Sequence, residues 1–306
     1  MAELEKLKRA SVPELNQILG IPFKVLDDGF VRVIDYMGTD ASIVQAARVS
    51  YGKGTKKVRQ DRELIRYLMR HWHTSPFEMC EIKLHVRVPM DTWRQWIRHR
   101  TASVNEYSTR YSVAIDSQQM TKPKEWRVQG IENRQGSAGF IDAALGKELT
   151  EQEKNLQRLS REVYEFRLES AVAREQARKD LPLSTYTEAY WKIDLHNLLH
   201  FLRLRMDDKA QLEIRSFALV IGHEIVARWC PLIWESFLDY RMESLNLSTR
   251  EVNILRECLA GNDEKAVEMA LELGLLKREK DEFKTTLELR ELETKLKRMG
   301  VVTPWR

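Results

Sequence analysis

The chain has 306 residues, of which 43% are hydrophobic and 31% charged, which indicates a soluble globular protein large enough to bury a sizeable core. Its 50 basic and 46 acidic residues leave a net charge of +4, too small an excess to predict nucleic acid as a partner. Three dispersed cysteines, no apolar run near the ~20 residues of a membrane span and no apolar signal segment favour a cytoplasmic protein over a secreted or membrane-bound one.

The amino-terminal segment predicts a short helix. Ser11 and Glu14 have the spacing of a capping box, and Gly20 would end the helix, so residues 1–24 are expected to form a helical extension. The next predicted elements are a strand over residues 30–36, a helix over 41–49 with Asp40 as its cap, and an amphipathic helix over 61–71.

Residues 80–88 form the clearest predicted strand, because apolar and polar side chains alternate without interruption. Such alternation is typical of a sheet with one face packed on helices. Cys80 belongs to the apolar series, which favours a core position over a nucleophile. Pro89 ends the strand, and from Asp91 the apolar residues take helical spacing.

The second half of the chain is predicted to be mostly helical. The expected elements are a strand over 109–113, a polar loop over 115–148, a long helix over 151–179, a strand within 181–193, a helix capped by Asp194, and a helix over 209–230 ended by Pro231. From about Leu245 the chain changes to charged helices closed by Gly261, Gly274 and Gly300, which indicates a helical appendage for packing or assembly.

The segment at residues 98–110, RHRTASVNEYSTR, concentrates charged and hydroxyl side chains that a core would not tolerate unpaired. Its last three residues, a serine, a threonine and an arginine, could converge on a phosphate through hydroxyls, backbone N–H groups and a guanidinium. Arg98 and Arg100 point to different sides of the chain and could contact two anions, or a cofactor and a substrate. An ion-pair network at a subunit interface explains the same residues equally well.

Arg205 occupies the next position of an apolar helical stripe formed by Leu195, Leu198 and Leu202. A guanidinium that continues such a stripe needs a partner, because a buried charge is costly unless it is paired. One interpretation is a salt bridge to an interior carboxylate, or a side chain that reaches solvent at the helix end. The other is a cation offered to a bound planar or anionic ligand.

The role of two histidine pairs and of one acid–base pair is ambiguous from the sequence. His196 and His200, four residues apart, and the H-x-H pair at 71 and 73 could bind zinc, but no third ligand has a suitable spacing, so no metal site is predicted. Glu175 and Arg178 lie three apart near the end of the predicted long helix, where a cation is favourable in any case. The sequence has no glycine-rich phosphate loop, so side chains and loop amides would have to hold any nucleotide.

Five stretches resemble the flavin-dependent thymidylate synthase family in the expected order. R-H-R followed by seven residues and a serine, here Arg98-His99-Arg100 to Ser108, is the family signature. The other stretches are AARVSYG (46–52), HTSPFE (73–78), LPLSTYTEAYW (181–191) and LRMDDKAQLEIRSFA (204–218). The resemblance implies a catalytic domain over residues 25–244, followed here by the appendage 245–306. It also implies an α+β fold in which helices flank an antiparallel sheet.

The activity that this resemblance implies is the reductive methylation of dUMP to dTMP. Methylenetetrahydrofolate would donate the carbon, FAD reduced by NADPH would supply the hydride, and no cysteine nucleophile would be used. The family likeness also implies a homotetramer with FAD bound where subunits meet.

Site residues follow from the resemblance position by position. The implied dUMP contacts are Gln95, Arg98, Glu106, Tyr107, Ser108, Thr109, Arg110, Arg178 and Arg205, with Ser108 to Arg110 around the phosphate and Arg205 activating the uracil. The implied FAD contacts are Ser50, Ser75, Glu78, Arg98, His99, Arg100, Glu106, Asp194, His196 and His200. Asp194 and His196 stand where other members often have Asn and Arg, and Lys209 replaces a frequent histidine. The helical stripe and the resemblance thus select the same residue, Arg205.

An alternative from another class is a non-enzymatic nucleic-acid binder that uses the arginines of residues 94–110 as a basic patch. The nearly balanced charge of the chain and the presence of Glu106 inside the patch argue against it.

Overall fold

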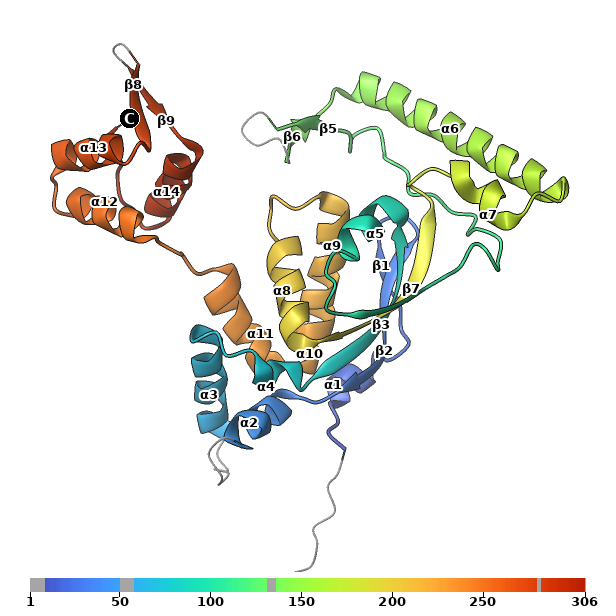
Figure 1. The fold of residues 1–306 in the computed structure, drawn as a ribbon, viewed down its shortest axis with the longest axis horizontal. Coiled ribbons are helices and arrows are strands. Elements are labelled where there is room, and N and C mark those ends of the chain that lie inside the picture. Colours follow the sequence, from blue (N-terminus) through green and yellow to red (C-terminus); the bar gives the residue numbers. More distant parts are fainter. Residues whose placement is uncertain (1–8, 50–57, 131–135, 280–281, 306) are drawn as a thin grey trace, which may run out of the picture. The chain divides into compact units, whose positions relative to one another are not determined.

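A computed structural model describes residues 9–49, 58–130, 136–279 and 282–305 of the chain (Figure 1). The chain divides into two compact units, Met1–Met242 and Glu243–Arg306. Among the described residues, no helix combines the length and the apolar character needed to cross a membrane.

The first unit is built on a five-stranded antiparallel sheet with the strand order β1-β2-β3-β7-β4. Its strands are β1 (Phe23–Val25), β2 (Gly29–Met37), β3 (Glu81–Pro89), β4 (Ser103–Glu106) and β7 (Tyr186–Asp194). β3 is central and pairs along its whole length with β7, from Glu81 opposite Asp194 to Pro89 opposite Tyr186. The predicted α+β fold with a helix-flanked antiparallel sheet is confirmed.

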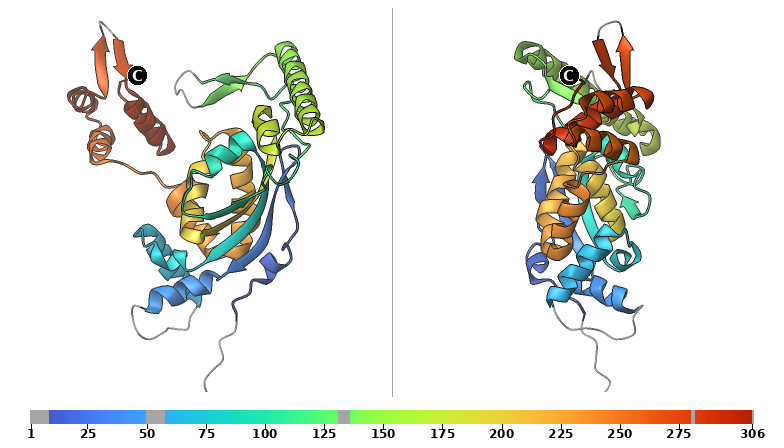
Figure 2. Two further views of the ribbon diagram at one scale, coloured as in Figure 1. Left: turned by 45° about the vertical axis from the view of Figure 1, so that its right-hand side comes forward. Right: turned by 90° about the vertical axis from the view of Figure 1, so that its left-hand side faces the viewer.

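The first unit also contains the helices α1 to α11, which connect or pack against the strands. They are α1 (Pro13–Asn16), α2 (Asp40–Val49), α3 (Val58–Arg70), α4 (Ser75–Glu78), α5 (Met90–Trp96), α6 (Ala143–Glu169), α7 (Arg174–Ala177), α8 (Leu195–Arg205), α9 (Leu212–Val220), α10 (Ala227–Trp229) and α11 (Pro231–Phe237). A 3-10 turn spans Arg178–Asp180, and π-helical turns span Ile221–Val226 and Leu238–Met242. α8 and α9 lie on one face of the sheet (Figure 2).

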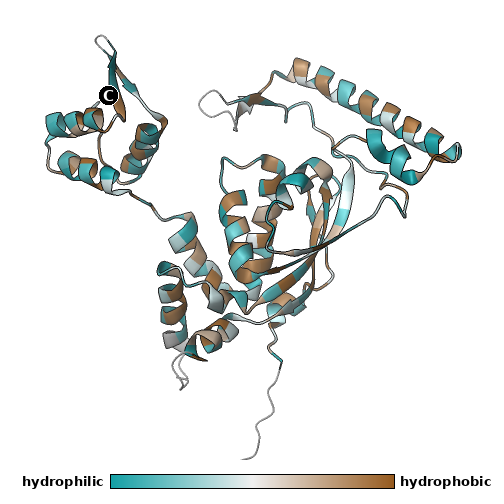
Figure 3. Ribbon diagram, viewed as in Figure 1, coloured by the Kyte–Doolittle hydropathy of each residue, from teal (hydrophilic) through white to brown (hydrophobic). Residues whose placement is uncertain are grey.

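The core lies between this face of the sheet and the two helices. The alternation of β3 places Ile82, Leu84 and Val86 in it, each fully buried, as the sequence predicted. Hydrophobic stripes on the helices face the same layer (Figure 3). The rings of Trp96 and Phe201 lie 4.9 Å apart between centroids, and those of Trp191 and Phe201 lie 5.2 Å apart. This aromatic cluster joins α5, β7 and α8, the elements that carry the candidate site.

The segment between β4 and β7 differs most from the prediction. Residues 109–111 form a turn where a strand over 109–113 was expected. The strand of this region is β4, which ends before the turn at Glu106. Residues 115–148 are not one loop, because β5 (Arg127–Gln129) and β6 (Ser137–Phe140) form a hairpin and α6 already begins at Ala143. The predicted helix over 151–179 is two helices, since Ala171 takes a φ of +58° and ends the first.

Two predicted capping residues do not cap the helices that they were assigned to. α1 begins after Val12 without a side-chain cap, and the hydroxyl of Ser11 accepts a hydrogen bond from the Asn16 amide instead. Asp40 is the first residue of α2, but its carboxylate accepts the backbone N–H groups of Leu232 and Ile233 at 3.0 and 3.2 Å. It therefore stabilises the start of α11, whose first residue is Pro231, the proline that was expected to end the preceding helix.

Asp194 does cap α8 as predicted. Its Oδ1 accepts the backbone N–H of Asn197 at 2.9 Å and its Oδ2 accepts the amide of the same residue at 2.7 Å. The expected helix over 209–230 begins at Leu212 and continues through a π-helical turn into α10.

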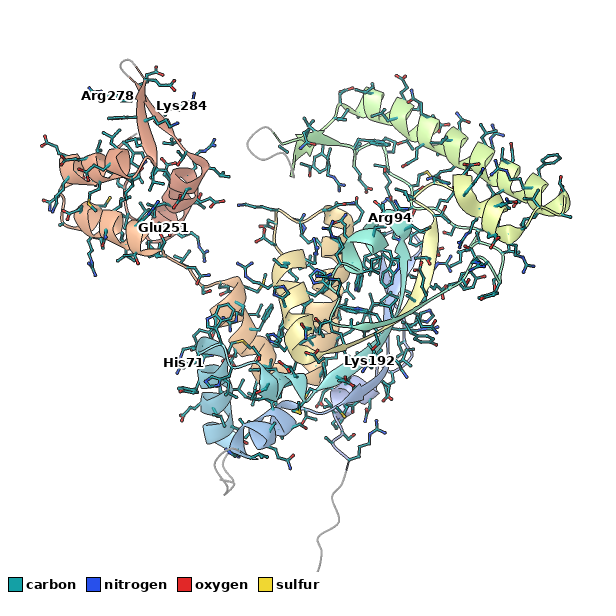
Figure 4. The ribbon with its side chains drawn as sticks, in the orientation of Figure 1. His71, Arg94, Lys192, Glu251, Arg278 and Lys284 are labelled. Atoms are coloured by element: carbon teal, nitrogen blue, oxygen red, sulfur yellow. The ribbon has the colours of Figure 1, made fainter. Side chains whose placement is uncertain are left out.

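The second unit has its own small core, which includes Ile254, Leu289, Leu292 and Leu296. Its elements are α12 (Thr249–Leu259), α13 (Asp263–Glu272), β8 (Leu276–Glu279), β9 (Glu282–Thr285) and α14 (Leu287–Arg298). Glu251, labelled in Figure 4, lies in the capping box of α12 and accepts a hydrogen bond from Lys295 on α14 at 2.5 Å. The β8–β9 hairpin is an addition to the helices that the sequence predicted.

Candidate active site

Two cavities contain most of the predicted site residues, and they lie at opposite ends of β4. The segment before β4 contributes to one, which we name the Arg205 cavity, and the segment after β4 contributes to the other, the Ser108 cavity. The Arg205 cavity, of about 410 Å³, is lined by Arg98, His99, Arg100, Thr101, Ile193, Asn197, His200, Leu204 and Arg205. The Ser108 cavity, of about 550 Å³, is lined by Met90, Arg94, Glu106, Tyr107, Ser108, Thr109, Arg110, Ala114, Arg178, Lys179, Leu181, Leu183, Thr185, Tyr186 and Thr187.

The Ser108 cavity brings the predicted phosphate segment next to the short helix α7. Arg178 donates a hydrogen bond to Thr109 Oγ1 at 2.6 Å, and Arg110 forms an ion pair with Glu175 at 3.1 Å. Glu175 and Arg178, whose spacing alone was ambiguous, therefore both contact residues 109–110. These contacts hold the segment against α7 and place Ser108, Thr109 and Arg110 in the lining of the cavity.

Cationic groups outnumber carboxylates around the Ser108 cavity. Arg94, which projects from α5 (Figure 4), and Lys179 join Arg110 and Arg178, while Glu106 supplies a carboxylate. Glu106 is held by a hydrogen bond from Thr187 Oγ1 at 2.9 Å. Arg110 is paired with Glu175, so these four cations face two carboxylates, and the remaining positive charge favours an anion such as a phosphate.

In the Arg205 cavity the guanidinium is half-buried and contacts an imidazole. Arg205 Nε donates to His99 Nε2 at 3.1 Å, so its partner is a neutral ring and not the interior carboxylate of one sequence interpretation. Burial, followed by the charge of Arg98, lowers the pKa of Arg205. The hydrogen bond uses the Nε group, which leaves the two terminal nitrogens of the planar fork to meet a ligand.

His99 is held in the neutral state that this contact requires. Burial is the main cause that lowers the pKa of His99 to about 4, and the charges of Arg205 and His200 act in the same direction. Because Nε2 accepts the hydrogen bond, the proton of the neutral ring lies on Nδ1. The ring also packs edge-on against Phe201 with centroids 4.9 Å apart, so the aromatic core fixes the group that orients Arg205.

Comparison with known proteins places the chain in a family. The sequence profile described as "Thymidylate synthase complementing protein" matches residues 32–232. A protein of Wolbachia pipientis wMel named "Flavin-dependent thymidylate synthase" is 51% identical over 259 residues, which are 85% of this chain and 91% of that protein. The chain belongs to the flavin-dependent thymidylate synthase family.

Other members of this family extend the match. A protein of the same name from Rickettsia prowazekii (strain Madrid E) is 47% identical over 292 residues, 90% of this chain and 97% of its own length. The crystal structure of the UMP/dUMP methylase PolB from Streptomyces cacaoi, bound with 5-Br dUMP, is similar with a TM-score of 0.65 and 30% identity. It covers 72% of this chain and 98% of its own. The chain is therefore an enzyme of the methyltransferase class.

The positions that the family resemblance implied for FAD are spread over several elements. Arg98, His99 and Arg100 line the Arg205 cavity together with His200. Ser75 and Glu78 are exposed on α4, which packs against α8, the helix of His196 and His200. Both carboxylate oxygens of Asp194 bind Asn197, and Glu106 lies at the Ser108 cavity. Ser50 lies outside the described residues.

The positions that the family resemblance implied for dUMP divide between the two cavities. Arg98 and Arg205 line the Arg205 cavity, whereas Glu106 to Arg110 and Arg178 line the other, and no described residue lines both. Thr187 at one cavity and Ile193 at the other are six residues apart on β7, which corresponds to about 20 Å of strand. Gln95 lines neither cavity and binds Gln211 instead.

Sequence reasoning missed several lining residues, of which Asn197 and Leu204 are the clearest. Both line the Arg205 cavity with His200, and the spacing of the three residues places them on one face of α8. That periodicity was readable in the sequence. Lys179 of the Ser108 cavity had no comparable signal, because only the fold brings the 3-10 turn Arg178–Asp180 to this cavity. Arg94 was considered only as part of the basic patch of the nucleic-acid alternative.

The second ambiguous histidine pair lies elsewhere in the unit. His71 and His73 flank Tyr67 on α3, with ring centroids 4.3 and 5.8 Å from that of the tyrosine. In the described part of the chain, no group of three or more His, Cys, Asp and Glu side chains is arranged to hold a metal ion.

Proposed function

We propose that this enzyme methylates dUMP to dTMP, with methylenetetrahydrofolate as the carbon donor, FAD reduced by NADPH as the hydride source, and no cysteine nucleophile. The observation that carries the proposal is the half-buried Arg205, oriented by a neutral His99 within the R-H-R segment. The likeness to PolB, a UMP/dUMP methylase bound with 5-Br dUMP, supports the choice of substrate.

The phosphate of dUMP is assigned to the Ser108 cavity and its uracil to Arg205. Ser108, Thr109, Arg110 and Arg178 supply hydroxyls, backbone N–H groups and guanidinium groups, the donors that a phosphate monoester needs. Within one chain, the distance between the two cavities exceeds the length of a nucleoside monophosphate. We therefore infer that the two halves of each dUMP site come from different subunits, as the proposed homotetramer with FAD where subunits meet would allow.

The Arg205 cavity suits an anionic, hydrogen-bonding heterocycle such as FAD. It offers the charges of Arg98 and Arg100, the Nδ1–H of His99, the hydroxyl of Thr101 and the amide of Asn197. Bound there, FAD would supply the redox chemistry, with NADPH as the source of electrons. The protein's residues orient the ligand and place positive charge beside it.

Arg205 would act on the uracil by electrostatics. Addition to the uracil ring places negative charge on the ring oxygens and N3, and a fixed guanidinium in a water-poor pocket stabilises that charge. One oriented donor of this kind is worth about 3–4 kcal/mol in comparable oxyanion sites. The hydrogen bond to His99 holds the guanidinium plane before the reaction, so little reorganisation is needed.

The cysteines support a mechanism without a thiolate. Cys80 is fully buried beside Gly38, and burial raises the pKa of its thiol to about 12. Cys230 is also fully buried, and burial raises its pKa well above the usual value. Cys258 belongs to the second unit, and its pKa is raised by burial as well. A protonated, buried thiol is a poor nucleophile. Free thiols also favour a cytoplasmic location.

A spectroscopic and an assay measurement test this function together. The purified protein should show the absorbance of oxidised flavin at about 450 nm, and NADPH under anaerobic conditions should bleach it. With dUMP and methylenetetrahydrofolate added, dTMP should form, and leaving out any one component should abolish it. A colourless protein that binds DNA in a salt-sensitive manner would refute the proposal and favour the basic-patch alternative.

A further inference from the structure

The long helix α6 is held to its own chain through one face. Buried polar side chains recur on this face at every seventh residue, namely Thr150, Gln157 and Tyr164. Gln157 Nε2 donates a hydrogen bond to the backbone carbonyl of Gln119 at 3.0 Å, and the phenolic oxygen of Tyr164 accepts the backbone N–H of Ala114 at 2.9 Å. These contacts fix the orientation of α6 on the first unit.

A different face of α6 is apolar and exposed, and we name it the α6 seam. Its positions follow one another at alternating steps of four and three residues: Leu145, Leu149, Gln152, Leu156, Leu159, Val163 and Phe166. Four of these side chains, Leu145, Leu156, Leu159 and Phe166, are 48%, 62%, 55% and 67% exposed. Hydrophobic residues recur along the whole helix in Figure 3. The seam is about 30 Å long, and an exposed apolar strip of this length marks an interaction surface.

The spacing of the seam indicates what kind of surface covers it. Alternating steps of three and four residues give the 3.5-residue repeat of a coiled coil, here sustained over about three heptads. A seam with this repeat stays in contact with another helix of the same repeat, because both wind around each other. The helix is already formed by its contacts with its own chain, so pairing has no cost of helix formation.

Within this protein, the matching surface is α6 itself. Among the other helices that the structure describes, none exposes more than two large apolar side chains. α9 comes nearest, with Leu212 and Leu219 at 38% and 37% exposure. The seam therefore finds its equal only in α6 of a second copy.

Gln152, the one polar residue of the seam, points to the same partner and to its direction. Its Nε2 donates to Glu148 Oε1 at 3.1 Å, and its Oε1 accepts no hydrogen bond from any residue that the structure describes. In a parallel pair in register, equal positions face each other, so the two Gln152 amides can bind one another. In an antiparallel pair each amide would face an apolar residue. A single polar position of this kind specifies the register of a coiled coil.

We propose that α6 binds α6 of a second copy of this chain as a parallel, in-register, two-helix coiled coil. Beside the seam, Glu162 would face Arg167 of the second copy and Glu148 would face its Glu153, so one attractive and one repulsive pair balance. No residue of α6 lines the Arg205 cavity or the Ser108 cavity. The contact is thus separate from both halves of the dUMP site, and the inference does not rest on the proposed function.

The first test introduces charge into the seam and measures the mass of the FAD-loaded assembly by sedimentation. Leu156→Glu with Leu159→Glu changes two exposed side chains outside the core, and we expect the mass of the assembly to fall by half. The matched control is Lys147→Glu with Lys154→Glu, which alters charge more but on exposed positions of α6 outside the seam, and it should keep the wild-type mass. An unchanged mass in the seam variant, or an equal fall in the control, would overturn the inference.

The second test checks the register. Gln152→Cys places two thiols opposite each other in the proposed pair, within reach of a disulfide, so oxidation should link two chains. Lys154→Cys, two residues away and outside the seam, should remain uncrosslinked, as should the wild type with its native cysteines. Absence of the link in Gln152→Cys, or an equal yield in Lys154→Cys, would overturn the parallel pairing. Neither readout needs turnover, so an enzyme that forms no dTMP would refute the proposed function and leave this inference standing.

Discussion

Replacing Arg205 by lysine separates the charge of this side chain from its hydrogen-bond geometry. The guanidinium uses Nε for His99 at 3.1 Å and keeps two terminal nitrogens in the same plane for a ligand. A lysine ammonium is a single point donor on a flexible stem, so it can meet either His99 or the substrate, but it cannot hold the fixed fork. The positive charge of the cavity is kept, and so is the environment that holds His99 neutral.

The expected loss in turnover for Arg205→Lys is on the order of 100-fold, which corresponds to about 2.7 kcal/mol and to one lost oriented donor. Binding of dUMP should weaken less than turnover falls, because the negative charge that Arg205 meets grows on the way to the transition state. FAD binding and the melting temperature should change little, since the stripe of Leu195, Leu198 and Leu202 that seats α8 in the core is untouched.

The assay measures single-turnover rates of dTMP formation with FAD content and melting temperature on the same samples. Arg203→Lys is the matched control, because Arg203 lies on the same helix and pairs with Asp207 at 3.5 Å outside the cavity. If Arg205→Lys loses melting temperature but keeps near-normal turnover per folded molecule, Arg205 has only a structural role. That result would refute the catalytic assignment and the electrostatic argument behind it.

The cysteines, the second unit and Asp40 each allow a further test. Replacement of Cys80, Cys230 and Cys258 by alanine should leave dTMP formation measurable, and a folded, flavin-loaded triple variant without activity would contradict the thiol-free mechanism. A chain ended at Met242 should still bind FAD and dUMP, because every residue assigned to these ligands precedes it and the second unit has its own core; a folded tetramer that binds neither would show otherwise. Burial raises the pKa of Asp40 to about 6, so the folded state retains a proton that the unfolded chain releases near pH 4. Unfolding free energy should therefore fall by up to about 3 kcal/mol between these pH values, and denaturant titrations of Asp40→Asn should lack this decrease.

Elements whose signal lies in their own residues were predictable from the sequence. β3 alternates over its whole length and is buried on one face because every second residue packs on the helices. α8 has both an Asp194 cap and a complete apolar stripe, and both are present in the structure. In these cases the local pattern and the tertiary environment specify the same conformation.

Elements stabilised by distant partners were not predictable. All residues of β4 are exposed, so the strand has no apolar pattern, and its order comes from pairing with β7 more than eighty residues later in the chain. Asp40 shows the same limit, since its carboxylate caps a helix whose backbone donors lie 192 and 193 residues away. A capping residue identifies a helix start but not which helix.

The candidate site was predictable to a similar extent. The contiguous R-H-R segment and the position of Arg205 on its stripe were visible, and they pointed to a ligand. The contact between His99 and Arg205 joins residues 106 positions apart, so their mutual orientation depends on the packing of α5 against α8. The division of the dUMP positions between two cavities also needed the structure, because residues 98–110 look continuous in the sequence but run past both ends of β4.

That division gives a prediction about assembly. If each dUMP site combines the Arg205 cavity of one subunit with the Ser108 cavity of another, two variants with defects in different cavities should complement each other. Arg205→Lys damages the first half, and Arg178→Ala damages the second by removing the hydrogen bond to Thr109. In a randomly mixed assembly about one quarter of the sites receive both intact halves, so activity should rise toward about a quarter of wild type.

Co-expression with two different tags, followed by purification on both, isolates the mixed assemblies for this measurement. Mixing Arg205→Lys with His99→Ala is the control, because both changes affect the Arg205 cavity and no intact site can form. If activity is recovered in the mixture of Arg205→Lys with Arg178→Ala but not in the control mixture, two chains must share each dUMP site. If the first mixture is no more active than the average of its parents, each site is built from one chain. The uracil and phosphate assignments to separate cavities would then be wrong, because one chain holds these cavities about 20 Å apart along β7.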